Sequence, residues 1–72
     1  MLGRVLRAAR LQLAELCHRS GDAEAAIAFY EQVVAEEPSS ITALHSLIGL
    51  YGERGDHAKA ARVLRSLIAL TP

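Results

Sequence analysis

A chain of 72 residues has room for one small domain with a thin core, because a chain of this size buries only about 60% of the surface that its unfolded form exposes. The composition is 51% hydrophobic but only 4% aromatic, which favours closely packed helices and argues against a β sandwich. Eight basic residues balance eight acidic ones, so no net field draws the chain onto nucleic acid or an anionic membrane. The single cysteine excludes an internal disulfide and a multi-cysteine zinc site; it leaves the compartment unknown and favours the cytoplasm over secretion.

The first segment, MLGRVLRAARLQL, contains Arg4, Arg7 and Arg10 and no acidic residue. This pattern superficially resembles a mitochondrial presequence, but its apolar spacing continues without a break into LQLAEL. The continuity favours a basic first helix, from about residue 4 to residue 19, over a cleaved leader. Its apolar residues on one face are Leu6, Leu13, Leu16 and Cys17. No stretch of the sequence approaches the roughly 20 apolar residues that span a bilayer.

A second helix is expected between the SGD sequence at residues 20–22 and Pro38. Gly21 can adopt positive φ and end the first helix, and Asp22 can cap the start of the second. Pro38 cannot continue a helix, so the chain is expected to restart at Ser39 or Ser40, either of which can cap a third helix. The apolar positions of the second helix are Ala26, Ile27, Tyr30, Val33 and Val34.

The second half of the chain repeats this pattern with a period of 34 residues, as Gly55 follows Gly21 and Pro72 follows Pro38. The third helix has its apolar residues at Leu44, Leu47, Ile48 and Tyr51. After a break at residues 54–56, where Asp56 repeats Asp22, the fourth helix continues with Ala60, Ala61, Leu64, Leu67 and Ile68. The sequence therefore predicts an all-α chain of four helices in two similar units.

These two units resemble the tetratricopeptide repeat, a 34-residue helical hairpin with a recurring set of apolar residues and a final proline. Those places are held in the first unit by Leu13, Ala14, Cys17, Ala26, Tyr30 and Pro38. In the second unit they are held by Leu44, Leu47, Ile48, Tyr51, Ala60, Leu64 and Pro72. Arg10, Cys17 and Ile48 depart from the family, which usually has a large apolar residue, a tyrosine and a small residue there. The resemblance implies an α-α superhelix of two stacked antiparallel helix-turn-helix repeats, residues 1–38 with an N-terminal extension and residues 39–72.

The resemblance also implies a site, because the first helix of each repeat lines a concave face that holds a peptide or helix of a partner protein. The residues that match this face are Ala8, Leu11, Glu15, His18, Arg19, Thr42, His45, Gly49, Gly52 and Glu53. Some family members bind a C-terminal carboxylate with lysine and asparagine on these helices. Here the matching places hold Leu11, Glu15 and Ser46, and the charge of Glu15 argues against that carboxylate clamp.

Two glycines, Gly49 and Gly52, lie three residues apart within the third helix, where each costs about 1 kcal/mol relative to alanine. One interpretation is that a partner approaches the backbone closely there. The alternatives are tight packing within the chain or fraying of the helix near Gly52.

The fourth helix spreads apolar residues over more than one stripe, although a repeat array usually ends in a helix with a polar outer face. We therefore expect a surface for a further repeat, or for self-association, formed by Val63, Leu64, Leu67, Ile68 and Leu70. The second helix is acidic and the fourth is basic, which would tolerate association between copies; ordinary solvated faces are the alternative.

Catalysis is not expected, because Cys17, His18, Ser20 and Asp22 supply reactive groups without a pocket-forming glycine loop or oxyanion donors. Cys17 is expected to be a small buried hydrophobe. The three histidines, His18, His45 and His57, lack further ligands at metal-binding spacing, and no phosphate or dinucleotide motif is present, so neither a metal nor a cofactor is expected. The sequence thus predicts a module that binds a protein or peptide, with a self-associating assembly unit as the alternative.

Overall fold

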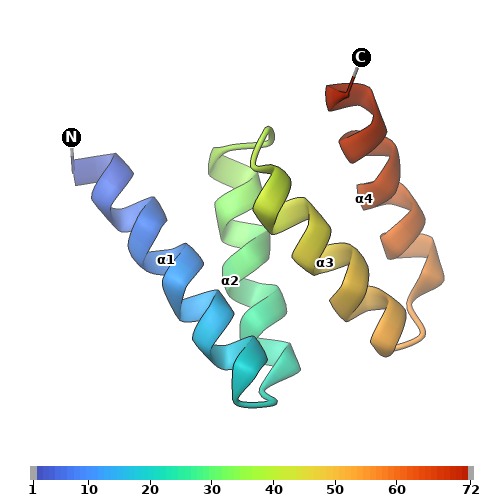
Figure 1. Cartoon of the computed structure of the whole chain (residues 1–72), viewed down its shortest axis with the longest axis horizontal. Coiled ribbons are helices and arrows are strands. Elements are labelled where there is room, and N and C mark those ends of the chain that lie inside the picture. The colour runs from blue at the N-terminus through green and yellow to red at the C-terminus, as the bar shows by residue number, and fades with distance from the viewer. Residues whose placement is uncertain (1, 72) are drawn as a thin grey trace.

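A computed structural model describes the backbone of residues 2–71 and the side chains of residues 5–71. Within this range the chain forms four helices and no strand: α1 (Leu2–Arg19), α2 (Ala23–Glu36), α3 (Ile41–Glu53) and α4 (His57–Leu70). Successive helices run antiparallel and stand side by side (Figure 1) in a flat molecule of 34 × 32 × 15 Å. The predicted all-α class and the four helices are confirmed. None of these helices is long and apolar enough to span a bilayer.

The two hairpin turns have the same geometry. Gly21 and Gly55 have φ of 88° and 76°, the left-handed region in which a Cβ would be strained. The amide of Asp22 donates to the carbonyl of Cys17 over 2.8 Å, and the amide of Asp56 donates to that of Tyr51 over the same distance. Together with the bonds donated by the glycine amides, this pattern closes α1 and α3 as Schellman motifs.

α2 and α4 begin with a side-chain cap, whereas α3 does not. The side chains of Asp22 and Asp56 accept hydrogen bonds from the amides of Ala25 at 3.2 Å and Lys59 at 3.3 Å, as predicted for N-caps. Ser40 occupies the N-cap position of α3, but its side chain makes no capping hydrogen bond. The predicted restart after the first proline is therefore correct, although the serine hydroxyl does not cap the helix. Pro72, the second predicted stop, lies outside the described residues.

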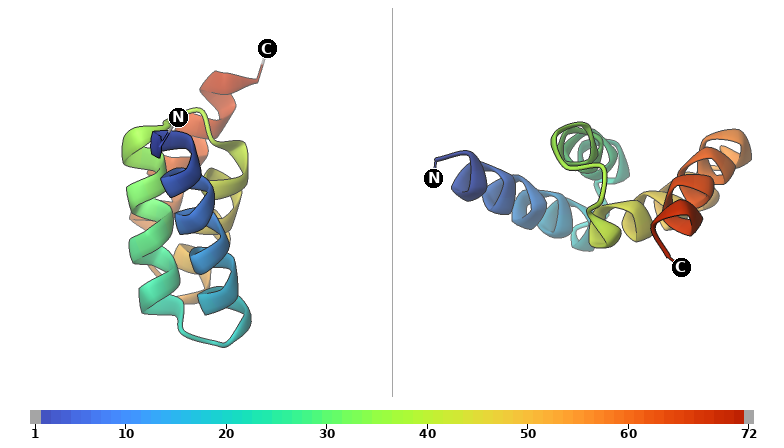
Figure 2. Two further views of the ribbon diagram at one scale, coloured as in Figure 1. Left: turned by 90° about the vertical axis from the view of Figure 1, so that its left-hand side faces the viewer. Right: turned by 90° about the horizontal axis from the view of Figure 1, so that it is seen from above.

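The core lies where α2 packs between α1 and α3. Tyr30 and Val33 of α2 are 1% and 2% exposed, and Leu47 and Leu50 of α3 are 2% and 0% exposed. The remaining buried residues are Ala14, Ala26, Ala43, Leu44 and Tyr51. Seen from above, α2 stands on one side of the line formed by α1 and α3 (Figure 2). Each hairpin is thus covered on one side by the other hairpin, and the two outer sides of the pair stay open.

The open side of α1 exposes leucines at the repeat positions whose equivalents in α3 are buried. Leu13 and Leu16 are 45% and 57% exposed, whereas Leu47 and Leu50, which follow them by 34 residues, are buried against α2. Leu6 is exposed as well, so the apolar face predicted for the first helix is largely in solvent. The difference arises because α3 has a hairpin in front of it and α1 has none among the residues described.

Candidate functional site

Two hollows are lined by residues of α1 and of α2. The larger, about 580 Å³, is lined by Arg7, Ala8, Leu11, Val33, Glu37 and Ser40. The second, about 360 Å³, is lined by Glu15, His18, Arg19 and Tyr30. All five α1 residues assigned from the sequence to a concave face therefore line one hollow or the other. Ala8, Leu11, Glu15 and His18 stand three or four residues apart, which places them on one face of the helix, and Arg19 follows His18 directly.

The five residues assigned to this face on α3 are all exposed but line neither hollow. They are Thr42, His45, Gly49, Gly52 and Glu53. The hollows reach the second repeat only through Ser40, immediately before α3. The structure thus groups the α1 residues with Tyr30 and Val33, which their helical spacing predicts as core residues and not as site residues.

The glycines of α3 do not face a close neighbour. A Cβ placed on Gly49 or Gly52 would meet no atom within 4 Å among the residues described. Packing inside the chain therefore does not explain either glycine, so that interpretation is wrong. The helix ends at Glu53, directly after Gly52, so fraying near Gly52 stays an alternative explanation for that glycine. The close approach of a partner stays a prediction.

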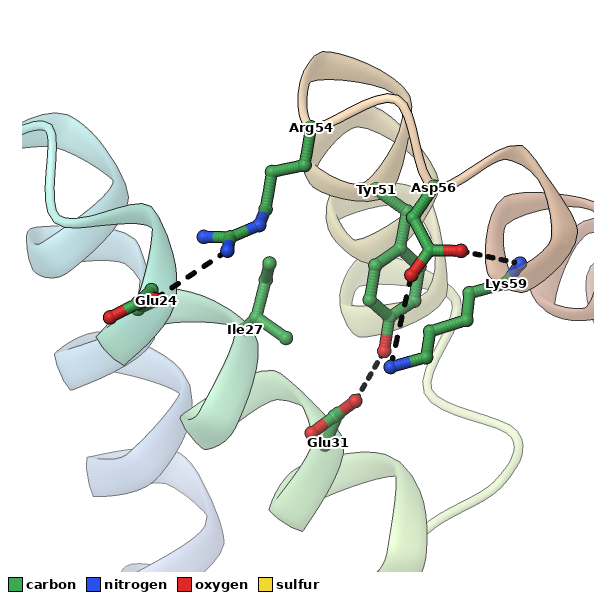
Figure 3. A pocket seen from close by; sticks show the side chains of 7 residues that line it. All are labelled: Glu24, Ile27, Glu31, Tyr51, Arg54, Asp56 and Lys59. Atoms are coloured by element: carbon green, nitrogen blue, oxygen red, sulfur yellow. Dashed lines mark hydrogen bonds and ion pairs between the residues drawn. The ribbon is translucent and has the colours of Figure 1, made fainter.

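A third cavity, about 230 Å³, lies where the two hairpins meet, near the turn between α3 and α4 (Figure 3). Its lining residues are Glu24, Ile27, Glu31, Tyr51, Arg54, Asp56 and Lys59. The Tyr51 hydroxyl donates to the Glu31 carboxylate, and the Arg54 guanidinium lies 3.5 Å from the Glu24 carboxylate. Both contacts join α2 to the second hairpin, so this polar cluster fixes how one repeat sits on the next.

Charge also surrounds the Tyr51 ring in this cavity. The Lys59 ammonium lies 5.8 Å from the centre of the ring and 3.8 Å from a carboxylate oxygen of Asp56. Burial raises the pKa of the Tyr51 hydroxyl well above its ordinary value, and the hydrogen bond to Glu31 raises it further, because the carboxylate disfavours a phenolate. The hydroxyl therefore stays protonated and available as a donor. No local sequence pattern indicates this cluster, since its members are scattered over residues 24–59.

The reactive residue types near the first turn are used to end and start helices. The Ser20 hydroxyl donates to the carbonyl of Cys17 at 3.0 Å, and the Asp22 carboxylate accepts from a backbone amide. Cys17 is half-buried and packs against the core, a less enclosed position than the predicted one. Among the residues described, no group of three or more histidine, cysteine or acidic side chains is placed to hold a metal ion.

Arg10, which replaces a usual apolar residue of the repeat pattern, forms an ion pair with Glu36 across the first hairpin.

At the opposite end of the molecule, α4 buries none of its residues. Val63 and Leu67 are half-buried, while Leu64, Ile68 and Leu70 are 43%, 60% and 41% exposed. Three of the five apolar residues expected to form a surface on the fourth helix are therefore exposed, and their role in an interface stays a prediction.

A protein-family model described as the TT21 fifth ARM repeats domain matches residues 7–70, a range that includes α2, α3, α4 and most of α1. The chain belongs to this family. It is a family of helical repeats that generally act as protein-interaction scaffolds. No curated protein and no solved structure matches the chain. Membership of the ARM repeat family confirms the helical-repeat class, and the finer assignment to tetratricopeptide repeats stays a prediction.

Proposed function

We propose that the chain is a non-catalytic module that binds a peptide or helix of a partner protein along the face of α1 and α3. The single observation that carries this proposal is the pair of hollows that follow α1, because all five α1 residues assigned to the face line them. The tetratricopeptide-like 34-residue period supports the same surface, since in that architecture the first helices line the inner groove.

The chemistry of the hollows favours a ligand of mixed character. The larger hollow is lined by the apolar side chains of Ala8, Leu11 and Val33 and by the charged residues Arg7 and Glu37. The smaller is lined by the polar residues Glu15, His18 and Arg19 together with Tyr30. An amphipathic peptide could place apolar anchors against the first group and opposite charges against the second. Gly49 and Gly52 have no side chain, and a Cβ at either position would meet open space, which favours close approach of a backbone at this part of α3.

The test is selection of binders from a phage-displayed library of random peptides, with the site mapped by amide chemical shifts of the chain. We expect a selected peptide to shift the signals of Ala8, Leu11, His45 and Gly49. Leu11→Glu should weaken binding at least tenfold, because it places a charge among the apolar contacts. Gln12→Glu, an exposed change that lines neither hollow, is the matched control. Peptides that shift only α4 signals, or bind Leu11→Glu equally well, would refute the proposal.

A self-associating assembly unit is the second candidate, because leucine and isoleucine side chains are exposed on both α1 and α4. Sedimentation equilibrium separates the two functions. A homo-oligomer that Leu11→Glu dissociates would favour assembly, and a monomer that binds peptide would favour recognition.

A further inference from the structure

The junction between the two hairpins shows how one repeat of this chain covers the next. The apolar part of this junction places Tyr30 and Val33 of α2 against α3, where Leu47 and Leu50 are buried. Its polar part lies at one edge, where Glu31 accepts from the Tyr51 hydroxyl and Glu24 faces Arg54. In each polar contact the acceptor belongs to the first repeat and the donor to the second.

The α2 residues of this junction have equivalents 34 residues later, on the open side of α4. Leu64 takes the place of Tyr30, and it is 43% exposed where Tyr30 is 1% exposed. Leu67 takes the place of Val33 and Ile68 that of Val34, so the apolar stripe is preserved. The polar edge is not preserved, because Arg65 stands where Glu31 stands in the first repeat. A neighbour that stacked on α4 would therefore meet a donor at the place where α3 meets an acceptor.

The other charged residues of α4 strengthen this exchange of an acceptor for a donor. From His57 to Leu70 the helix contains Lys59, Arg62 and Arg65 and no acidic residue. Lys59 pairs with Asp56, whereas Arg62 and Arg65 form no salt bridge among the residues described. Arg65 is exposed at the edge of the apolar stripe, so its guanidinium is positioned to receive a carboxylate from a stacked helix.

A second copy of the chain does not match this surface through α1. The α1 residue equivalent to Tyr51 is Cys17, which supplies no carboxylate for Arg65. Arg7, Arg10 and Arg19 make α1 basic, with Glu15 as its single acidic residue, so stacking α1 on the basic α4 would bring like charges together. Arg10 is also held by Glu36 of its own hairpin. The apolar stripes of the two open sides are alike, but both helices carry positive charge, so their charged residues would repel each other.

We infer that the open side of α4 is completed by a further helical hairpin that carries an acidic residue at the position equivalent to Tyr51, paired with Arg65. This inference concerns the end of the stack and is independent of peptide binding along α1 and α3.

The test extends the whole chain by a third hairpin copied from residues 39–72. Three versions carry tyrosine, glutamate or lysine at the copy of Tyr51. Each version is also prepared with Arg65→Glu, and with Arg62→Glu as the matched control, since Arg62 is equivalent to the exposed Ala28 and lies away from the junction. Urea unfolding followed by circular dichroism measures the stability of every chain.

We expect the glutamate version to have about a fivefold higher folding equilibrium constant than the lysine version, as for an exposed pair of good geometry. Arg65→Glu should reverse this order, and Arg62→Glu should leave it unchanged. The same order in the presence and absence of Arg65 would overturn the inference. So would a third hairpin that stays unfolded in all versions, or a homo-oligomer of the natural chain that both Leu13→Glu and Ile68→Glu dissociate.

Discussion

Leu47 and Leu13 occupy equivalent positions in the two repeats, and the structure predicts very different costs when each is shortened to alanine. Leu47 is 2% exposed, so Leu47→Ala removes nearly a whole buried side chain and leaves a cavity beside α2. Such changes cost about 3 kcal/mol, within a range of roughly 2 to 5. Leu13 is 45% exposed and lies at the edge of the stack, so its removal loses about half of the burial and creates no cavity, a cost of about 1 kcal/mol.

Urea unfolding of the two variants provides the measurement, and the difference between them is more informative than either value. The change in helix propensity from leucine to alanine is the same in both variants, so it cancels in the difference. The remaining difference of about 2 kcal/mol in the free energy of unfolding reports the burial of Leu47 by the neighbouring hairpin. Leu50→Ala and Leu16→Ala form a second pair with the same expected order, since these residues are 0% and 57% exposed. Equal costs for Leu13→Ala and Leu47→Ala would refute the reasoning, because they would mean that something covers α1 in solution as well.

Three further predictions concern glycines, a tyrosine and the helix caps. Gly49→Ala should stabilise the chain by about 1 kcal/mol, or roughly 4 to 8 °C in Tm, because alanine favours the helix and the added Cβ meets open space. Gly55→Ala should destabilise the chain by about 1 to 2 kcal/mol, because φ is 76° there. Thermal unfolding measures both, and changes of the same sign would contradict the prediction. Because the pKa of Tyr51 is raised above 10.0 in the folded chain, the folded state keeps a proton that the unfolded chain loses above that pH. Stability should therefore fall by up to about 1.4 kcal/mol per pH unit above pH 10, and Tyr51→Phe should flatten this slope in urea unfolding at pH 9 to 11; an unchanged slope would contradict the raised pKa. Asp22→Ala and Asp56→Ala should each cost about 1 kcal/mol, whereas Asp→Asn at either position should cost little, with circular dichroism as the assay.

Much of the fold follows from local chemistry and could be predicted from the residues alone. α1 and α3 end just before Gly21 and Gly55 because glycine takes positive φ without cost. α2 and α4 start directly after Asp22 and Asp56 because a carboxylate satisfies free amides. The α1 side of the candidate surface was also predictable, because helical spacing fixes which residues share a face.

The residues at the junction could not be predicted in the same way. Tyr51 and Glu31 stand 20 residues apart on different repeats, and no local pattern indicates that a hydroxyl and a carboxylate will meet. The cavity around them and the pair of Arg10 with Glu36 depend on the angle at which the helices pack. The open space around Gly49 is likewise a property of the packed helices, and it contradicts the interpretation of tight packing.

The sequence by itself determined four helices, their boundaries and the repetition of one hairpin, because helix formation and helix ends depend on neighbouring residues. The tertiary structure alone decided which copy of each apolar face is covered. Leu13 and Leu47 have the same place in the repeat, yet one is in solvent and the other is buried. The reason is physical: burial depends on what packs against a face, and among the residues that the structure describes another hairpin packs against α3 and none against the equivalent face of α1.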